Sequence, residues 1–392
     1  MSDTVAVRPM VTRRDMREFH LFPWRIYRDD PVWVPPLVPE RMKITDPAHG
    51  GFFRRGEAAF FGAYRSKTLV GTICVARDDE QIATIGRPEC IFGFFESIDD
   101  RSVAAALFSH ADSWARERGL ESLHGPFNLD YEDGYGILTD GGDREPVLFC
   151  GHTPPYYVGL LRSLGFEPAR AGNIALAIDL DRRSDRLEHI GRLADRVRAK
   201  GRFRVRSADV GRWQDEARRV HYLLNHSLHE TGEPAVPWPM DAVEGLIRPV
   251  LRIADPDLVL FAERVDGPAD IPRGPDGWVT VGWFAGIPNM NEITRHLKGL
   301  RRIWHYAILP FAMLRRPKCL AVKSLLVLPE YHTTGVAALL FDEMARRSRA
   351  KGYEWLDLSL TSEGNPQTPR VAERAGAVRY KRYQVYRRST GL

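Results

Sequence analysis

The alternation of apolar and polar positions predicts short strands and amphipathic helices along most of the chain. Apolar runs at 58–64, 69–76 and 91–96 predict three strands, and the turn-like residues 65–67 join the first two into a hairpin. The next segment ends at Gly119 and places apolar residues at helical spacing: Val103, Leu107, Ala111 and Trp114. Strands and helices that follow one another in this way predict an α/β fold.

The same order of elements occurs a second time. ARERGLESL (115–123) has a counterpart in SRAKGYEWLDL (348–358), and LLRSLGFEPA (160–169) has one in RVAERAGAVRY (370–380). In each pair a helix ends at glycine and a strand follows, so we expect one α/β domain used twice. The predicted division is a first half at 1–183, a helical connector at 184–201 and a second half at 202–392.

Composition and charge narrow the class of protein. The 392 residues are 44% apolar, enough for each half to bury a core, which excludes a disordered chain. The 56 Lys and Arg against 51 Asp and Glu give a formal charge of +5, which suits an anionic ligand but is too small to indicate nucleic-acid binding. The four cysteines form no C-x-x-C pair, so we expect neither a disulfide framework nor a thiolate zinc site.

Two segments of the sequence bear on where in the cell the protein is located. The amino terminus lacks the apolar run of a secretory signal, so we expect a cytoplasmic protein. The longest apolar stretch, 303–314, is interrupted by His305 and Pro310 and is shorter than the about 20 residues that span a bilayer. We therefore expect no transmembrane helix.

The segment SLLVLPEYHTTGVAALLFDEMARRSRAKGY (324–353) carries the most informative chemistry. Its apolar strand leads into a tight turn and then into a helix. The first N–H groups of such a helix lack intrahelical partners and lie at the positive end of its dipole, so they favour a phosphate. Gly335 has no side chain, so the backbone can approach that phosphate, and the small side chain of Ala337 does not obstruct it. The pattern predicts a pyrophosphate cradle, although the P-loop and dinucleotide-binding glycine patterns are both absent from it.

At these residues the chain resembles the GNAT superfamily of N-acyltransferases. The cofactor loop of that family begins with Gln or Arg and has Gly at its fourth position and Gly or Ala at its sixth. Here the loop consists of His332, Thr333, Thr334, Gly335, Val336 and Ala337, so His332 departs from the family's Gln or Arg. Asn365 lies eleven residues before Gly376, like the family's Asn beside the pantetheine arm. The family's Tyr, which often protonates the departing thiolate, should fall at Ala372 and is missing, so Tyr383, Tyr386 or a water has to supply that proton.

The resemblance extends over nearly the whole chain. FPWRIYRDDPVWVPPL, FGFFES, GPFNLDYEDGYG, PPYY and AGAVRYKRYQVY are similar to segments of tandem, two-domain GNAT proteins common in bacteria. This implies an α/β fold with two tandem GNAT-like acyl-CoA N-acyltransferase domains, each a mixed, mostly antiparallel sheet flanked by helices. In the first half the cofactor turn has no glycine and three carboxylates, Glu96, Asp99 and Asp100, which repel phosphate. We therefore expect the acyl donor, acetyl-CoA or a longer acyl-CoA, in the second half only.

Amide formation from a thioester requires a neutral amine, and a primary ammonium titrates at about pH 10, so a base or a desolvating pocket has to remove its proton. The candidate bases are His226 in HSLHE (226–230) and Glu292 in AGIPNMNEI (285–293), and Tyr383 is the candidate acid. The oxyanion is expected at the backbone N–H groups of Leu326, Val327 and Leu328, where this fold separates two strands. The HxxHE pattern does not have the HExxH spacing of a zinc site, so no metal is expected there. The alternative to a catalytic role is that these histidines are solvated residues on the surface of a helix.

The segment 299–318 has an apolar centre between two pairs of arginines, Arg301 with Arg302 and Arg315 with Arg316. One interpretation is a helix packed over the sheet. The other is a wall for a long acyl chain or lipid amine, with the arginines against an anionic membrane surface or an acidic acyl carrier protein. The apolar residues of that wall would be Ile303, Trp304, Ile308, Phe311 and Leu314. The second interpretation adds contact with the inner membrane face to the cytoplasmic location.

The sequence thus predicts an enzyme, an acyl-CoA-dependent N-acyltransferase that moves an acyl group from a CoA thioester to a primary amine by direct attack. Two alternatives stay open: a long-chain N-acyltransferase acting on a lipid amine such as a sphingoid base, and a non-catalytic acyl-CoA-binding sensor. The expected partner is a small-molecule or lipid amine, with an acyl carrier protein or a membrane surface left open and no nucleic acid.

Overall fold

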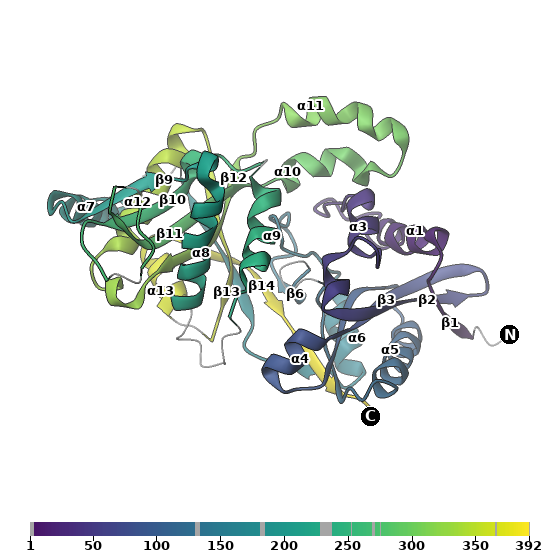
Figure 1. Ribbon diagram of the computed structural model, residues 1–392. Helices are drawn as coiled ribbons and strands as arrows, with labels where there is room; N and C mark the ends of the chain where they lie inside the picture. The colour runs from purple at the N-terminus through teal and green to yellow at the C-terminus, as the bar shows by residue number, and fades with distance from the viewer. Residues whose placement is uncertain are drawn as a thin grey trace. The chain divides into compact units, whose positions relative to one another are not determined.

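The computed structural model describes residues 4–129, 134–180, 185–227, 237–251, 253–268, 271–274, 276–364 and 367–391 (Figure 1). The chain forms two compact units. Unit 1 comprises Met1–Ile174, Met290–Arg316 and Lys381–Leu392, and unit 2 comprises Ala175–Asn289 and Pro317–Tyr380. Each unit is built around one mixed sheet with helices packed on it, which confirms the predicted fold class.

The sheet of unit 1 is antiparallel except at one pair of described strands, β4 and β5. Tyr64 pairs with Leu69 across a tight turn, so the hairpin predicted from 58–64 and 69–76 is confirmed. The strand order is β1 (Val5–Pro9), β2 (Gly56–Arg65), β3 (Thr68–Asp78), β4 (Glu89–Ser97), β5 (Ser122–Gly125), β15 (Tyr386–Ser389) and β7 (Glu167–Pro168).

Helices cover both faces of this sheet. Successive residues of a strand point to opposite faces, and Ile73 of β3 lies in one hydrophobic cluster while Cys74 lies in another. The first cluster is covered by α5 (Arg101–Arg116) and α6 (Tyr156–Ser163), and the second by α1 (Arg13–Leu21). The predicted helical spacing is confirmed in α5, whose buried residues include all four that the sequence indicated: Val103, Leu107, Ala111 and Trp114.

The segment 299–318 packs on the N-terminal helices of unit 1 (Figure 1). It forms short 3-10 and α-helices instead of the single helix that was one expectation, and left-handed backbone angles at Lys298, Gly299 and Leu300 interrupt the helical backbone before Ile303. Its inner residues Ile308 and Ala312 pack in a cluster with Leu37, ahead of α3 (Val38–Ile44), and not over the sheet. The elements here are α10 (Asn291–Thr294), η4 (Arg295–Leu300), η5 (Ile303–Ile308) and α11 (Leu309–Met313). Unit 1 also contains α2 (Pro23–Ile26), η1 (Gly51–Arg54), α4 (Asp79–Ile85) and β6 (Ile137–Asp140).

The sheet of unit 2 has helices packed through two separate hydrophobic clusters. Ala194 and Val197 of α7 (Asp185–Ala199) contact Leu339 of α12 (Val336–Ala350) in one cluster, and α7 occupies the stretch predicted as a helical connector. Val220 of α8 (Trp213–Ser227) and Val243 of α9 (Met240–Val250) pack in the other. The strand order is β14 (Val378–Gln384), β8 (Asn173–Asp179), β13 (Trp355–Ser362), β12 (Cys319–Val327), β11 (Val279–Pro288), β10 (Val259–Arg264) and β9 (Phe203–Ser207). The shorter elements are η2 (Val210–Arg212), η3 (Pro256–Leu258), η6 (Pro329–Tyr331) and α13 (Gln367–Arg374).

The two halves of the sequence exchange their final strands. β8 ends the first half and lies between β13 and β14 in the second sheet, whereas β15 ends the chain and lies between β5 and β7 in the first sheet. The compact units therefore interleave segments of the predicted halves 1–183 and 202–392. The predicted boundaries of the two repeated halves, 1–183 and 202–392, remain a prediction.

Among the described residues, no helix is long and apolar enough to cross a membrane. The same residues contain no group of three or more His, Cys, Asp or Glu side chains placed to hold a metal ion.

Candidate active site

The turn between β12 and α12 is shaped around Gly335. This residue caps the helix with a φ of 87°, and a Cβ atom added to it would lie 2.7 Å from Cγ2 of Val197. Leu339 N donates to Gly335 O, which begins the α-helical hydrogen bonding. The N–H groups of the first helical turn have no intrahelical acceptor and suit an anion. The structure thus places a glycine-dependent, anion-compatible turn at the predicted cradle.

The other residues predicted to hold the cofactor lie in this turn or just before it. His332 is exposed, and its Nε2 atom lies 2.9 Å from the carbonyl oxygen of Val327. Thr334 donates its hydroxyl to the carbonyl of Tyr331, and Thr333 is exposed. Leu326, Val327, Leu328 and Val336 are buried, and Ala337 is half-buried. Asn365 lies outside the described residues. The binding role of each of these residues stays a prediction.

β12 loses one of its two neighbouring strands partway along its length. It pairs with β11 as far as Val327, but with β13 only from Cys319 to Ala321. A β-bulge lies beyond that point, where Ser324 has a φ of 63°. Leu328 N donates to Val281 O on β11, so strand alternation directs the N–H of Val327 to the opposite side, which β13 no longer covers. Val327 is thus the predicted oxyanion donor that faces the unpaired edge.

Four polar residues of unit 2, which we call the Asp357 cluster, gather where β12 and β13 separate: Lys323, Asp357, Ser359 and Tyr380. The Asp357 carboxylate is fully buried and accepts hydrogen bonds from the Tyr380 hydroxyl, at 2.7 Å, and from the Ser359 hydroxyl. Lys323 Nζ lies 3.2 Å from Ser359 Oγ and 3.7 Å from an Asp357 oxygen. A buried carboxylate held by an ammonium and two hydroxyls forms a hydrogen-bonded path along which a proton can move.

The corresponding position in unit 1 is closed by its own chain. β4 carries a similar bulge, with a φ of 44° at Phe94. The chain that follows β5 stays on β4, because Phe127 N donates to Phe92 O and Phe94 N donates to the Asn128 side chain. These contacts occupy the strand edge that is unpaired in unit 2.

The turn after β4 also differs in charge from its counterpart in unit 2. Asp100 accepts a hydrogen bond from Ser102 N at the start of α5, and its contacts with Ser102 and Arg65 lower its pKa to about 2. Glu96 accepts hydrogen bonds from Tyr157 at 2.7 Å and Tyr27 at 3.4 Å, and burial raises its pKa to about 7. Neither group favours a pyrophosphate, which supports the prediction that acyl-CoA binds in the second half only.

Solved structures and curated proteins resemble this chain along its whole length, whereas no protein-family model matches it. A tandem GNAT protein from the clavulanic acid biosynthesis pathway superimposes with a TM-score of 0.57 at 12% identity, covering 99% of both chains. A GCN5-related N-acetyltransferase from Sphaerobacter thermophilus gives 0.52 at 14% identity, covering 100% of this chain and 97% of that one. The chain therefore has a tandem GNAT fold.

Two curated proteins are similar to this tandem GNAT-fold protein in sequence. The bacterial ceramide synthase of Caulobacter vibrioides (strain NA1000 / CB15N) is 29% identical over 398 residues, which cover 98% of this chain and 97% of the relative. Protein YghO of Escherichia coli (strain K12) is 26% identical over 395 residues, covering 97% and 94%. The predicted resemblance and fold are confirmed by these findings.

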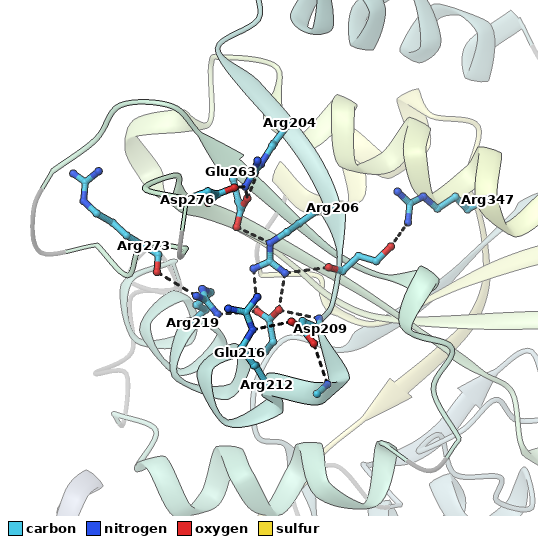
Figure 2. Close-up of polar contacts among 12 residues, drawn as sticks. Arg204, Arg206, Asp209, Arg212, Glu216, Arg219, Glu263, Arg273, Asp276 and Arg347 are labelled. Carbon is cyan, nitrogen blue, oxygen red and sulfur yellow. Dashed lines mark hydrogen bonds and ion pairs between the residues drawn. The ribbon is translucent and has the colours of Figure 1, made fainter.

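An ion-pair network joins β9, β10 and α8 of the tandem GNAT-fold protein, as Figure 2 shows. Glu263 of β10 is fully buried, and its two oxygens accept hydrogen bonds from Arg204 and Arg206 of β9. Arg206 also donates to Glu216 at 2.6 Å, near the start of α8. Arg347 of α12 donates to Ser207 Oγ at 2.6 Å, so the helix that begins at the cradle is tied to the same edge of the sheet.

The three residues predicted as catalytic lie in different parts of the tandem GNAT-fold protein. His226 is on α8 in unit 2, where its Nδ1 lies 2.7 Å from Tyr222 O and its ring stacks on Tyr222. Glu292 is half-buried on α10 in unit 1. Tyr383 is fully buried in the unit 1 part of β14, and its hydroxyl donates to Gly151 O at 3.1 Å. Their catalytic roles stay predictions, and the neighbouring candidates His229 and Glu230 lie outside the described residues.

The Asp357 cluster was not among the sequence candidates. Its signal was a charged residue inside each of two apolar strands, Lys323 in LAVKSLLVLP and Asp357 in WLDLSL. A charged residue in a buried strand requires a partner, and the sequence does not indicate that these two are partners. Tyr380 lies three residues before Tyr383, which the sequence analysis named instead.

Proposed function

We propose that this tandem GNAT-fold protein is an acyl-CoA-dependent N-acyltransferase that acts on a long-chain lipid amine. The observation that carries the reaction class is the unpaired edge of β12, which has the Gly335 turn at one end and the Asp357 cluster at the other. The lipid acceptor is supported by the similarity of the whole chain to a bacterial ceramide synthase, since a ceramide is the amide of a fatty acid and a sphingoid base.

In this proposal, residues of unit 2 hold the acyl donor. The first-turn N–H groups of α12 bind the pyrophosphate, and Gly335 forms the left-handed turn that precedes them. The pantetheine arm takes the place of the missing strand beside Leu326 and Val327, with Asn365 proposed beside it. The N–H of Val327 then donates to the thioester oxygen, which becomes negative as the amine attacks.

The Asp357 cluster is proposed to carry the protons of the reaction. The amine nitrogen bonds to the carbonyl carbon, and the carbon–sulfur bond breaks to release a thiolate. The proton lost by the amine passes to Asp357, and the Tyr380 hydroxyl gives its proton to the sulfur and regains one from Asp357 through their 2.7 Å hydrogen bond. Lys323 Nζ lies 3.7 Å from the carboxylate and places a positive charge beside Asp357. His226, Glu292 and Tyr383 remain alternative candidates for these roles.

The proposed lipid acceptor also indicates the length of the acyl donor and the kind of surface that the protein contacts. We propose a long-chain acyl-CoA in preference to acetyl-CoA, because a ceramide carries a fatty acyl group. Of the two open partner surfaces, an acidic acyl carrier protein and a membrane, we propose the membrane, since a long-chain amine partitions into lipid. The protein would then act at the inner membrane face.

The test is amide formation by the purified full-length chain. Palmitoyl-CoA and sphinganine dispersed in detergent should give an amide detectable by mass spectrometry, together with an equal amount of free CoA thiol. Acetyl-CoA with a short primary amine should react more slowly. Tight binding of acyl-CoA without amide formation from any amine tested would contradict an enzyme and favour the acyl-CoA sensor.

The role of the cluster is tested by Tyr380→Phe, which removes one hydroxyl from the Asp357 cluster. We expect kcat to fall about 100-fold or more while KM for acyl-CoA changes little, as for loss of a general acid. Tyr353→Phe is the matched control, because Tyr353 follows the far end of α12, beyond Gly352. If Tyr380→Phe keeps the wild-type kcat, the acid is another group, and Tyr383→Phe becomes the variant to measure.

A further inference from the structure

Unit 1 exposes large apolar side chains on two short helices, η5 and α11. Isolated exposed apolar residues are ordinary on a protein surface, but a dense group marks a contact surface. The exposed fractions are 84% for Ile303, 59% for Trp304, 46% for Tyr306, 72% for Phe311, 52% for Met313 and 81% for Leu314. We call these six residues the outer face of the 301–316 segment.

The start of the 301–316 segment and its inward-facing side chains contact other residues of unit 1. Arg17 of α1 donates to Arg301 O at 2.7 Å, and the Arg301 guanidinium lies 4.9 Å from the ring centre of Trp24. Ile308 and Leu309 pack inward against a buried cluster that contains Leu297. The inner apolar residues thus hold the short helices in place, and the outer ones are exposed.

The sequence of the segment carries charge of one sign. Between residues 295 and 318 the sequence contains seven Lys and Arg and no Asp or Glu, although the net charge of the whole chain is only +5. Arg302 precedes the apolar turns, Arg315 and Arg316 follow them, and all three are exposed. Apolar side chains between exposed cations match the boundary of an anionic bilayer, where phosphates lie next to hydrocarbon.

We propose that the outer face of the 301–316 segment docks the protein on an anionic lipid bilayer. The arginines bind headgroup phosphates, while Ile303, Phe311 and Leu314 enter the hydrocarbon boundary and Trp304 lies at the interface. This inference rests on the proposed function in one respect, because an enzyme that acylates a lipid amine has to obtain it from a membrane. An acidic carrier protein explains the arginines but does not require six exposed apolar side chains.

The experiment is co-sedimentation of the full-length chain with vesicles of phosphatidylglycerol and phosphatidylcholine in equal amounts. The wild type should bind, and its binding should weaken at about 1 M salt, where the Debye length is about 3 Å. Phe311→Ser together with Leu314→Ser should lower the partition coefficient about tenfold or more. Arg315→Gln together with Arg316→Gln should lower it about tenfold at low salt.

Val11→Ser together with Val378→Ser is the matched control, because Val11 is 78% exposed, Val378 is 66% exposed, and both lie outside the segment. This control should bind vesicles within about twofold of the wild type. The arginine variant should keep the wild-type kcat with a soluble short-chain donor and a detergent-dispersed amine. A failed acyl-transfer assay with intact vesicle binding therefore refutes only the proposed function, and the reverse result refutes only the docking.

Four results would overturn the docking proposal. The wild type could ignore the vesicles, or the serine variant could bind them as well as the wild type does. The wild type could bind a purified acidic acyl carrier protein through its arginines and not the vesicles. Light scattering could show that the outer face joins two copies of the chain, with association lost in the serine variant and no vesicle binding.

Discussion

Gly335 and Gly352 lie at the two ends of α12 and allow a matched test of the cofactor turn. Both have left-handed backbones, with φ values of 87° and 86°. A Cβ at Gly335 would lie 2.7 Å from Val197 Cγ2, whereas a Cβ at Gly352 would have no atom within 4 Å. Alanine at either position therefore loses the same stability through its left-handed backbone. Only alanine at position 335 also collides with a packed side chain.

The expected losses of stability follow from these two terms. The left-handed backbone costs alanine about 1–2 kcal/mol. Val197 is buried against Ala194 and Leu339 and cannot move freely, so overpacking adds about 1–3 kcal/mol. We expect Gly352→Ala to lower the free energy of unfolding by about 1–2 kcal/mol and Gly335→Ala to lower it by about 2–5 kcal/mol. Urea denaturation with hydrogen exchange of peptides from α12 measures both.

Binding of CoA should separate the two variants further. Gly335→Ala moves the N–H groups that the proposal assigns to the pyrophosphate, so calorimetry should show CoA binding weakened about tenfold or more. Gly352→Ala should bind CoA like the wild type. If both variants lose the same stability and keep the same CoA affinity, the contact with Val197 does not shape the turn and the cradle lies elsewhere.

Two buried carboxylates give further tests. Glu263→Gln removes the buried anion that Arg204 and Arg206 share, so that Arg204 keeps only Asp276 and Arg206 only Glu216 as carboxylate partners, and it should lower the free energy of unfolding of unit 2 by about 3–5 kcal/mol. Asp276→Asn, at a carboxylate 46% exposed, should cost less than about 1 kcal/mol, and equal losses in urea denaturation would contradict the network's importance. Glu96 has a folded pKa of about 7 against an ordinary 4.5, so the folded state holds a proton that the unfolded state releases between these values. Wild-type stability should thus fall between about pH 4.5 and pH 7, by up to about 3 kcal/mol relative to Glu96→Gln, and a pH-independent difference would refute the shift.

Local patterns predicted the parts of the fold that are local in sequence. The β2–β3 hairpin, the buried stripe of α5 and the turn at Gly335 each depend on residues within about one element, where periodicity and glycine geometry are informative. The exchange of β8 and β15 could not be predicted in this way. Each pairs with strands far away along the chain, and a strand's apolar pattern does not identify its neighbour.

The candidate site shows the same limit in its side chains. Lys323 and Asp357 are 34 positions apart and Tyr380 is 23 further on, so only the sheet brings them together. The 299–318 segment illustrates a second limit. Its composition indicated an apolar surface, but the sequence did not reveal that Ile308 packs inward while Ile303 is exposed, because a short 3-10 helix is followed there by a short α-helix and the two have different periods.

The placement of β15 has a consequence for synthesis of the protein. Tyr386 is fully buried in the main hydrophobic cluster of unit 1, and Arg388 forms a buried ion pair with Asp112 of α5. Both residues lie more than 250 positions after β5 in the sequence, so a ribosome synthesises them long after β5. Until then β5 presents an uncovered edge, of the kind that invites pairing with other chains. The sheet of the nascent first half is therefore incomplete until most of the second half has been synthesised, and a chain truncated before Tyr386 lacks the strand that lies between β5 and β7.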